Sequence, residues 1–245
     1  MFQHEWSRPL PEQLEQIVQT VPGWTPPDQL CALFNLAVAS AHVPGDIIEI
    51  GSWCGRSAAV LALAARFAGQ GRVHCVDLFP TRRDWYRNAD GSYSFQVTVD
   101  GETIRAYATQ TVWQEPFERD IAPLYERCDG ILDYFRSTMD RFALSDGITV
   151  TRGTIEHFAR QAPADLACRL AFIDGDHGYP ALVRDVEHVE RWLSPGGWIC
   201  FDDAFTGYEA VDRVINERIL GSGRYDCAYR ITRKCFVARR ASAAP

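Results

Sequence analysis

Lysine is almost absent from this chain. Lys234 is the only lysine among 25 basic residues, and the others are arginine. This scarcity excludes a Walker phosphate loop, which needs a lysine in its glycine-rich turn, and it disfavours Schiff-base chemistry. A net charge of −7 argues against an extended nucleic-acid surface, because such a surface needs clustered positive charge.

Long apolar runs are also missing. The longest, Ala58–Ala65, is far too short to span a bilayer. The first ten residues contain His4, Glu5 and Arg8 and lack the apolar core of a secretory signal. The eight cysteines form no C-x-x-C pair and no zinc spacing, which favours reduced thiols in a reducing compartment. We therefore expect a cytoplasmic protein whose partners include neither a membrane nor a nucleic acid.

The length and composition fit one α/β domain over residues 1–245. The chain is 47% apolar and 23% charged, and 245 residues suffice for one large core. Residues 1–44 carry two helical patterns that we expect to cover one end of a sheet. Trp24 lies between them, and we expect it mainly to pack rather than to form the wall of a pocket.

The most informative stretch runs from residue 46 to residue 77. Asp46–Ile50 and Val73–Val76 are short apolar runs typical of buried parallel strands. Gly51 and Gly55 allow a tight turn into an alanine-rich helix, and Asp77 closes the second strand. A strand, a glycine turn at a helix N-terminus and an acid after the next strand form the adenosine site of open α/β sheets.

The loop itself favours one adenosine ligand over another. Its pattern is E49-x-G51-x-x-x-G55 rather than the G-x-G-x-x-G of dinucleotide sites. The carboxylate of Glu49 would repel a pyrophosphate, whereas it suits the cationic methionine end of S-adenosylmethionine. The sequence therefore predicts an S-adenosylmethionine site.

An insertion interrupts the regular alternation of helix and strand. The next such unit begins only near Asp129, which leaves Leu78–Cys128 where a crossover normally takes a few residues. Alternating residues around Asp100-Gly101 predict a hairpin that pairs Val97 with Ile104. The insertion is rich in aromatic residues: Trp85, Tyr86, Tyr93, Tyr107, Trp113, Phe117 and Tyr125. Two readings stay open: a lid or substrate wall beside the cofactor, and a dimer interface or packing flap.

Three carboxylates follow two further predicted strands. Asp174 ends the strand at 170–173, and Asp202 and Asp203 end the strand at 198–201. If these strands are neighbours, the carboxylates gather at the edge that also holds the glycine loop. Such a cluster of oxygen ligands suits Mg²⁺. The alternative is that Asp202 or Asp203 caps the helix after its strand, and that Asp176 caps the helix before it.

The motif E-I-G-S-W-C-G-R-S at 49–57 resembles the nucleotide loop of catechol-type O-methyltransferases, in the class I S-adenosylmethionine-dependent superfamily. The chain resembles the metal-dependent catechol-type and sugar O-methyltransferases (methyltransferase family 24-like) at a second place. Those enzymes carry an acid after the fourth strand and two metal ligands 28 and 29 positions later, the spacing of Asp174, Asp202 and Asp203. The catechol enzymes have Asn at the last position, and the macrolide-sugar and aminocoumarin-sugar enzymes have Asp. Three residues after the first ligand the catechol enzymes place a lysine base and some sugar enzymes a histidine, as His177 is here.

The resemblance covers residues 45–77 and 147–240 and implies a Rossmann-like class I methyltransferase fold. Its sheet has seven mostly parallel strands in the order 3-2-1-4-5-7-6, with the last strand antiparallel. The implied metal ligands are Asp174, Asp202 and Asp203, and the implied catalytic residues are His177, as the base, and Asp174. The residues implied to bind the cofactor are Glu49, Gly51, Ser52, Trp53, Gly55, Ser57, Asp77, Leu78, Gly153, Thr154 and Asp174.

The function expected from this resemblance is methyl transfer to a hydroxyl. The enzyme would use S-adenosylmethionine and Mg²⁺, and the acceptor would be a sugar, a phenol or another small molecule of natural-product biosynthesis. His177 could instead be a solvated loop histidine. Two rival functions stay open, a non-catalytic S-adenosylmethionine-binding protein and a nicotinamide oxidoreductase. The identity of the acceptor is open, and so is the oligomeric state, with a homo-oligomer as one possibility.

Overall fold

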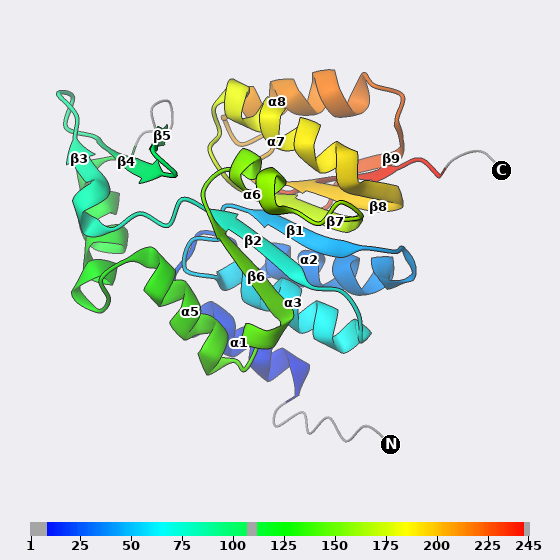
Figure 1. Ribbon diagram of the computed structural model, residues 1–245, viewed down its shortest axis with the longest axis horizontal. Helices are drawn as coiled ribbons and strands as arrows, with labels where there is room; N and C mark the ends of the chain where they lie inside the picture. The colour runs from blue at the N-terminus through cyan, green and yellow to red at the C-terminus, as the bar shows by residue number, and fades with distance from the viewer. Residues whose placement is uncertain (1–8, 107–111, 243–245) are drawn as a thin grey trace.

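The computed structural model of the protein describes residues 9–106 and 112–242, so Tyr107 of the aromatic insertion lies outside the described residues. Seven strands form a large sheet (Figure 1). They are β1 (Asp46–Ile50), β2 (Val73–Asp77), β6 (Ile148–Arg152), β7 (Cys168–Ile173), β8 (Leu193–Phe201), β9 (Tyr225–Arg230) and β10 (Phe236–Arg240). Their spatial order is β6-β2-β1-β7-β8-β10-β9. Numbered within this sheet alone, that is the predicted order 3-2-1-4-5-7-6.

The direction of the strands also agrees with the prediction. β6, β2, β1, β7 and β8 pair in parallel, and β10 runs antiparallel to both β8 and β9. The central strands β1 and β7 are buried along almost their whole length, because both faces of the sheet are covered. The predicted Rossmann-like class I architecture is therefore confirmed.

Helices cover the two faces of the large sheet (Figure 1). One face packs against α1 (Leu10–Thr20), α2 (Pro27–Ala39), α3 (Arg56–Ala68) and α5 (Ile131–Arg141). The other packs against α6 (Ile155–Gln161), α7 (Tyr179–Trp192) and α8 (Glu209–Val214). The short helical turns are η1 (Ser40–His42), η2 (Arg82–Asp84), α4 (Gln114–Pro116), η3 (Phe117–Ile121), η4 (Ala122–Glu126), η5 (Ser145–Gly147) and η6 (Ile215–Leu220).

The insertion after β2 forms a second, three-stranded antiparallel sheet beside the large one (Figure 1). Its strands are β3 (Trp85–Arg87), β4 (Tyr93–Val99) and β5 (Glu102–Ala106). The predicted hairpin is confirmed, because Val97 pairs with Ile104 and the turn residues Asp100 and Gly101 both have positive φ. Seven side chains form a small core of its own: Trp85, Phe95, Val97, Val99, Ala106, Phe117 and Ile121.

The helices and the cysteines bear on the environment expected for the chain. In the part of the chain that the structure describes, no helix is both long and apolar enough to cross a membrane. All eight cysteines are free thiols, and five of them are buried.

Candidate functional site

The loop between β1 and α3 packs tightly against the end of β7. The backbone N–H of Gly51 donates to Val76 at 2.9 Å, and that of Asp174 donates to Ile50 at 2.8 Å. Gly51 has φ +91°, and a Cβ there would overlap the carbonyl oxygen of Asp174. Only glycine fits such a position, since it combines a left-handed backbone with a close backbone contact. The loop thus brings the predicted cofactor residues next to the predicted catalytic ones.

Asp77 is held in place by the same loop. Its carboxylate accepts backbone N–H bonds from Trp53 at 2.9 Å and from Phe79 at 2.5 Å. Burial raises the pKa of Asp77, and these two N–H donors oppose the rise only in part. Each carboxylate oxygen has two lone pairs, so capacity remains for the hydroxyls of a ribose.

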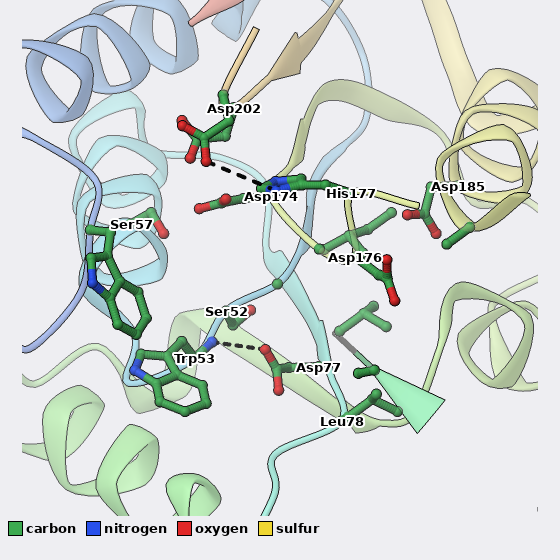
Figure 2. Close-up of a pocket in the computed structure, with 18 of the residues that line it drawn as sticks. Ser52, Trp53, Ser57, Asp77, Leu78, Asp174, Asp176, His177, Asp185 and Asp202 are labelled. Carbon is green, nitrogen blue, oxygen red and sulfur yellow. Dashed lines mark hydrogen bonds and ion pairs between the residues drawn. The ribbon is translucent and has the colours of Figure 1, made fainter. Parts of the chain in front are cut away.

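A cavity of about 640 Å³ opens at this edge of the sheet. Figure 2 shows Asp77 and Trp53 at one end of it and Asp174, His177 and Asp202 at the other. The nucleotide half and the acid–base half of the predicted site therefore share one space.

Twelve of the predicted site residues line this cavity: Gly51, Ser52, Trp53, Ser57, Asp77, Leu78, Gly153, Thr154, Asp174, His177, Asp202 and Asp203. Two do not, Glu49 and Gly55. Glu49 is buried beneath the loop, and its burial raises the pKa to about 7 against the opposing influence of the Ser52 and Ser57 hydroxyls. Gly55 has φ +90° and its α-carbon faces the side chains of Met139 and Phe135, so its role is to shape the start of α3.

The three carboxylates gather as predicted, because β7 and β8 are neighbours. The backbone N–H of Asp202 donates to Ile173 at 3.0 Å, directly beside the end of β7. Burial raises the pKa of Asp174, and the charge of Asp202 raises it further.

A residue of the opposite charge lies among these acids. Nζ of Lys234 is 2.7 Å from Asp202 Oδ2 and 3.2 Å from Asp203 Oδ1. The other oxygen of Asp202 accepts a hydrogen bond of 2.5 Å from Nε2 of Gln29. Burial alone would lower the pKa of Lys234, but the charges of Asp202 and Asp174 outweigh it and the pKa is raised. The ammonium is therefore charged at neutral pH.

This donor set does not fit the predicted magnesium ion. A divalent ion at these carboxylates would meet the ammonium of Lys234, which lies 2.7 Å from Asp202 Oδ2 and 3.2 Å from Asp203 Oδ1, and two like charges repel each other. Within 9–106 and 112–242, no three His, Cys, Asp or Glu side chains are grouped so that they could hold a metal. We assign no step of the reaction to a metal.

His177 lies against these acids and is buried, 7% exposed. Its Nδ1 is 4.0 Å from Asp203 Oδ2, and its ring packs on Tyr208 with 4.4 Å between ring centroids. Burial lowers the pKa of His177, although the charges of Asp203 and Asp202 oppose this. A buried, neutral imidazole in the cavity wall contradicts the alternative of a solvated loop histidine.

Aromatic side chains form the remaining wall of the cavity. Trp24 packs on Trp53 at 5.7 Å between ring centroids, and Trp53 packs edge-on against Trp85 at 6.5 Å. Trp24 is 51% exposed and lines the cavity, so it forms part of the pocket wall as well as packing on Trp53. The insertion adds Phe95, Ile104, Arg105, Ala106, Val112, Pro116 and Ile121 to the lining.

Four residues of the site were missed in the sequence. Gln29 and Tyr208 give no local signal, because only the fold brings them to Asp202 and His177. Asp185 lines the cavity from α7, and burial raises its pKa to about 8, which a helical pattern does not reveal. Lys234 did give a signal: it is the one lysine in a chain that otherwise uses arginine.

Comparison with known proteins places this site in a family. A family model described as a methyltransferase domain matches residues 48–204, more than half of the chain. Among solved structures, the chain is similar to the O-methyltransferase NovP, with a TM-score of 0.62 and 17% identity over 89% of this chain and 83% of NovP. It is also similar to an O-methyltransferase from Bacillus cereus in complex with SAH (TM-score 0.57, 17% identity, 96% of this chain and 92% of that one). A third similar structure is CalS11, a TDP-rhamnose 3'-O-methyltransferase (TM-score 0.52, 14% identity, 93% and 92%). The chain therefore belongs to this methyltransferase family, as the resemblance of its nucleotide loop predicted.

Proposed function

We propose that this protein transfers a methyl group from S-adenosylmethionine to a hydroxyl oxygen of a small molecule. The observation that supports this most is the shared cavity, in which the Gly51 loop and Asp77 face His177 and Asp202. One end offers groups that bind an adenosine, and the other offers a neutral base among carboxylates. Membership of the methyltransferase family supports the same proposal.

The residues present fit S-adenosylmethionine. Asp77 would hold the ribose hydroxyls, and Gly153 and Thr154 would border the adenine. Nε1 of Trp53 is buried at the loop without a partner among the described residues, so it can serve a ligand. When bound, S-adenosylmethionine supplies an electrophilic methyl group on a positively charged sulfur.

His177 is the proposed general base. Its Nδ1 faces Asp203, which leaves Nε2 to take the proton of the acceptor hydroxyl. Its lowered pKa keeps the ring neutral at pH 7, as a proton acceptor must be. Tyr208 packs against the ring at an interplanar angle of 53° and holds it, so the base is in place before the acceptor arrives.

We infer that the acceptor presents its hydroxyl on a ring. The aromatic wall of Trp24, Trp53 and Phe95 offers flat apolar surfaces, on which the faces of sugars and phenols pack well. CalS11, which this chain resembles in fold, carries the description TDP-rhamnose 3'-O-methyltransferase. A nucleotide-linked deoxysugar therefore belongs in a first panel of acceptors, together with catechols and other phenols.

The first test combines binding with turnover. Calorimetry should show S-adenosylhomocysteine binding to the wild type but no binding of NAD. Asp77→Ala should weaken that binding by about 1.5–3 kcal/mol, the scale of hydrogen bonds to a charged group. His177→Ala should bind S-adenosylhomocysteine like the wild type and lose about 10²–10⁴-fold in methylation rate, the range for a general base.

Three outcomes would contradict the proposal. Binding of NAD without binding of S-adenosylhomocysteine would indicate an oxidoreductase. Binding without turnover on every acceptor of the panel would favour a non-catalytic binding protein. Full activity of His177→Ala would remove the histidine from the mechanism.

A further inference from the structure

Asp174, Asp202 and Asp203 form the acid cluster of this site. The fold places Lys234, the only lysine of the chain, in this cluster by two independent sets of contacts. Its ammonium contacts Asp202 and Asp203. Its backbone carbonyl accepts a hydrogen bond of 2.9 Å from the N–H of Ala204, the residue directly after those acids. Both the main chain and the side chain of Lys234 are thus tied to the turn that follows β8.

The loop that carries this lysine is held in shape by hydrogen bonds between its own residues. Between β9 and β10, the N–H of Ile231 donates to the carbonyl of Cys235 at 2.9 Å, and the Cys235 N–H donates to Oγ1 of Thr232 at 3.2 Å. Cys235 is fully buried, and Lys234 is only 7% exposed. The ammonium is therefore not a mobile surface charge that happens to reach the carboxylates.

We propose that Lys234 is the built-in cation of this site, and that it takes the place of the divalent metal ion used by the metal-dependent methyltransferases that the sequence resembles. An ion coordinated to Oδ2 of Asp202 at the usual magnesium distance would lie within about 5 Å of Nζ, where two like charges in a dry site repel strongly. The carboxylates cannot bind the ammonium and the metal ion at once without this cost.

The ammonium can also act on the acceptor, and this part rests on the proposed methyl transfer. An ammonium has three N–H donors, and among the described residues the two carboxylates account for two of them. Lys234 lines the cavity, so the third donor can reach the acceptor oxygen. As that hydroxyl passes its proton to Nε2 of His177, negative charge develops on the oxygen, and a fixed cation beside it stabilises this charge.

Metal binding tests the first part without any turnover. After treatment with chelator and removal of the chelator, the wild type should bind no Mn²⁺ in the millimolar range, followed by electron paramagnetic resonance of free Mn²⁺. Lys234→Met removes the charge at similar length and should let Asp174, Asp202 and Asp203 close around a Mn²⁺ ion, which they are not grouped to do with the ammonium against them. Lys234→Arg keeps the charge and should bind none. Arg233→Met, which removes the neighbouring exposed charge, is the matched control and should also bind none.

The double variant Lys234→Met with Asp203→Asn should lose the new site, because one ligand charge is gone. Binding of one Mn²⁺ per wild-type chain would overturn the proposal. Absence of Mn²⁺ binding in Lys234→Met would overturn it too, provided that the variant still melts cooperatively. If Lys234→Met does not fold, Lys234→Gln serves the same purpose, and the wild-type measurement decides on its own whether a metal is excluded.

Turnover tests the second part. Wild-type methylation should be unchanged by chelator, and Lys234→Met should lose about 10²-fold in kcat, the effect of removing one donor to a developing oxyanion. Inhibition of the wild type by chelator, or an unchanged kcat in Lys234→Met, would overturn this role. Failure of S-adenosylhomocysteine to bind any of these proteins would instead count against the proposed function and leave the Mn²⁺ result standing.

Discussion

At the level of single residues, the notable feature of this site is a set of buried carboxyl groups with raised pKa values. Glu49, Asp77, Asp174 and Asp185 are all held at pKa values above their ordinary ones, and in each case burial is the largest cause. An ionised carboxylate in such a place costs free energy unless a donor or a cation faces it. Lys234 faces Asp202 and Asp203, whereas Glu49 has only hydroxyls and a thiol beside it.

Glu49 should therefore make the cofactor-free protein less stable at alkaline pH. Its pKa rises from 4.5 in the unfolded chain to about 7 in the folded protein. The folded state then holds its proton more tightly, so the free energy of unfolding falls as the pH rises from about 4.5 to about 7 and stays low above that. Glu49→Gln should abolish this loss and be more stable than the wild type at pH 8 by on the order of 3 kcal/mol.

Urea denaturation at pH 4.5 and at pH 8 measures the effect. At the lower pH the wild type and Glu49→Gln should have similar free energies of unfolding. Asp185→Asn should likewise be more stable than the wild type at pH 8, because burial raises the pKa of Asp185 to about 8, and its gain should continue to grow above pH 7, where that of Glu49→Gln has levelled off. Equal stability of the wild type and Glu49→Gln at pH 8 would contradict this account.

At the level of elements, the insertion is a wall built on its own small core. Phe95, Val97 and Phe117 pack together apart from the large sheet, and the insertion meets the cofactor loop through Trp85 and Trp53. Phe79 and Leu124, in contrast, belong to the core under the large sheet. The part that can be removed without opening the main core is therefore 85–121, narrower than the predicted 78–128.

Replacing residues 85–121 by a glycine–serine linker should separate cofactor binding from acceptor binding. Asp77, Leu78 and the Gly51 loop remain, so calorimetry should show S-adenosylhomocysteine binding with most of its affinity. Methylation should be lost, because the wall that would contact the acceptor is gone. Arg119→Ala alters only exposed ion pairs of the insertion and should leave both properties unchanged.

The same variant distinguishes the two readings of the insertion. Unchanged KM for the acceptor in the truncated protein would contradict the substrate wall. A change from dimer to monomer in light scattering, with methylation retained, would instead support an interface.

At the level of the whole molecule, the acid cluster joins distant parts of the chain. Gln29 comes from α2, Asp202 follows β8, and Lys234 lies between β9 and β10. The N-terminal helices are tied to the cofactor loop as well, since Arg56 donates to the carbonyls of Val18 and Val21. The site therefore depends on the fold of almost the entire chain.

Gln29→Leu should show this dependence. Gln29 is fully buried, and the variant removes the donor to one oxygen of Asp202 while keeping a side chain of similar size. The expected loss is about 1.5–3 kcal/mol in the free energy of unfolding, measured by urea denaturation. Gln19→Leu changes an exposed glutamine whose side chain, among the described residues, donates to Glu15, and it should cost less than about 0.5 kcal/mol. Equal costs for the two variants would show that the contact with Asp202 contributes nothing.

The order of the strands followed from the family resemblance, and most of the cofactor half could be predicted from the residues themselves. Asp46–Ile50, the glycines of the loop and Asp77 carry local signals, because a buried strand, a tight turn and an acid at a strand end are each encoded within a few residues. The hairpin pairing of Val97 with Ile104 is equally local, since the Asp100-Gly101 turn sets its register.

The cation that neutralises the acid cluster follows from the packing of distant elements and could not be predicted from the sequence. The spacing of Asp174, Asp202 and Asp203 predicted three neighbouring carboxylates, and such a group favours a metal ion as long as nothing else is near. Lys234 and Gln29 reach Asp202 from 32 and 173 residues away along the chain. No local pattern records a contact made across the sheet, because a charge pair of this kind depends on where whole elements pack and not on the residues beside it.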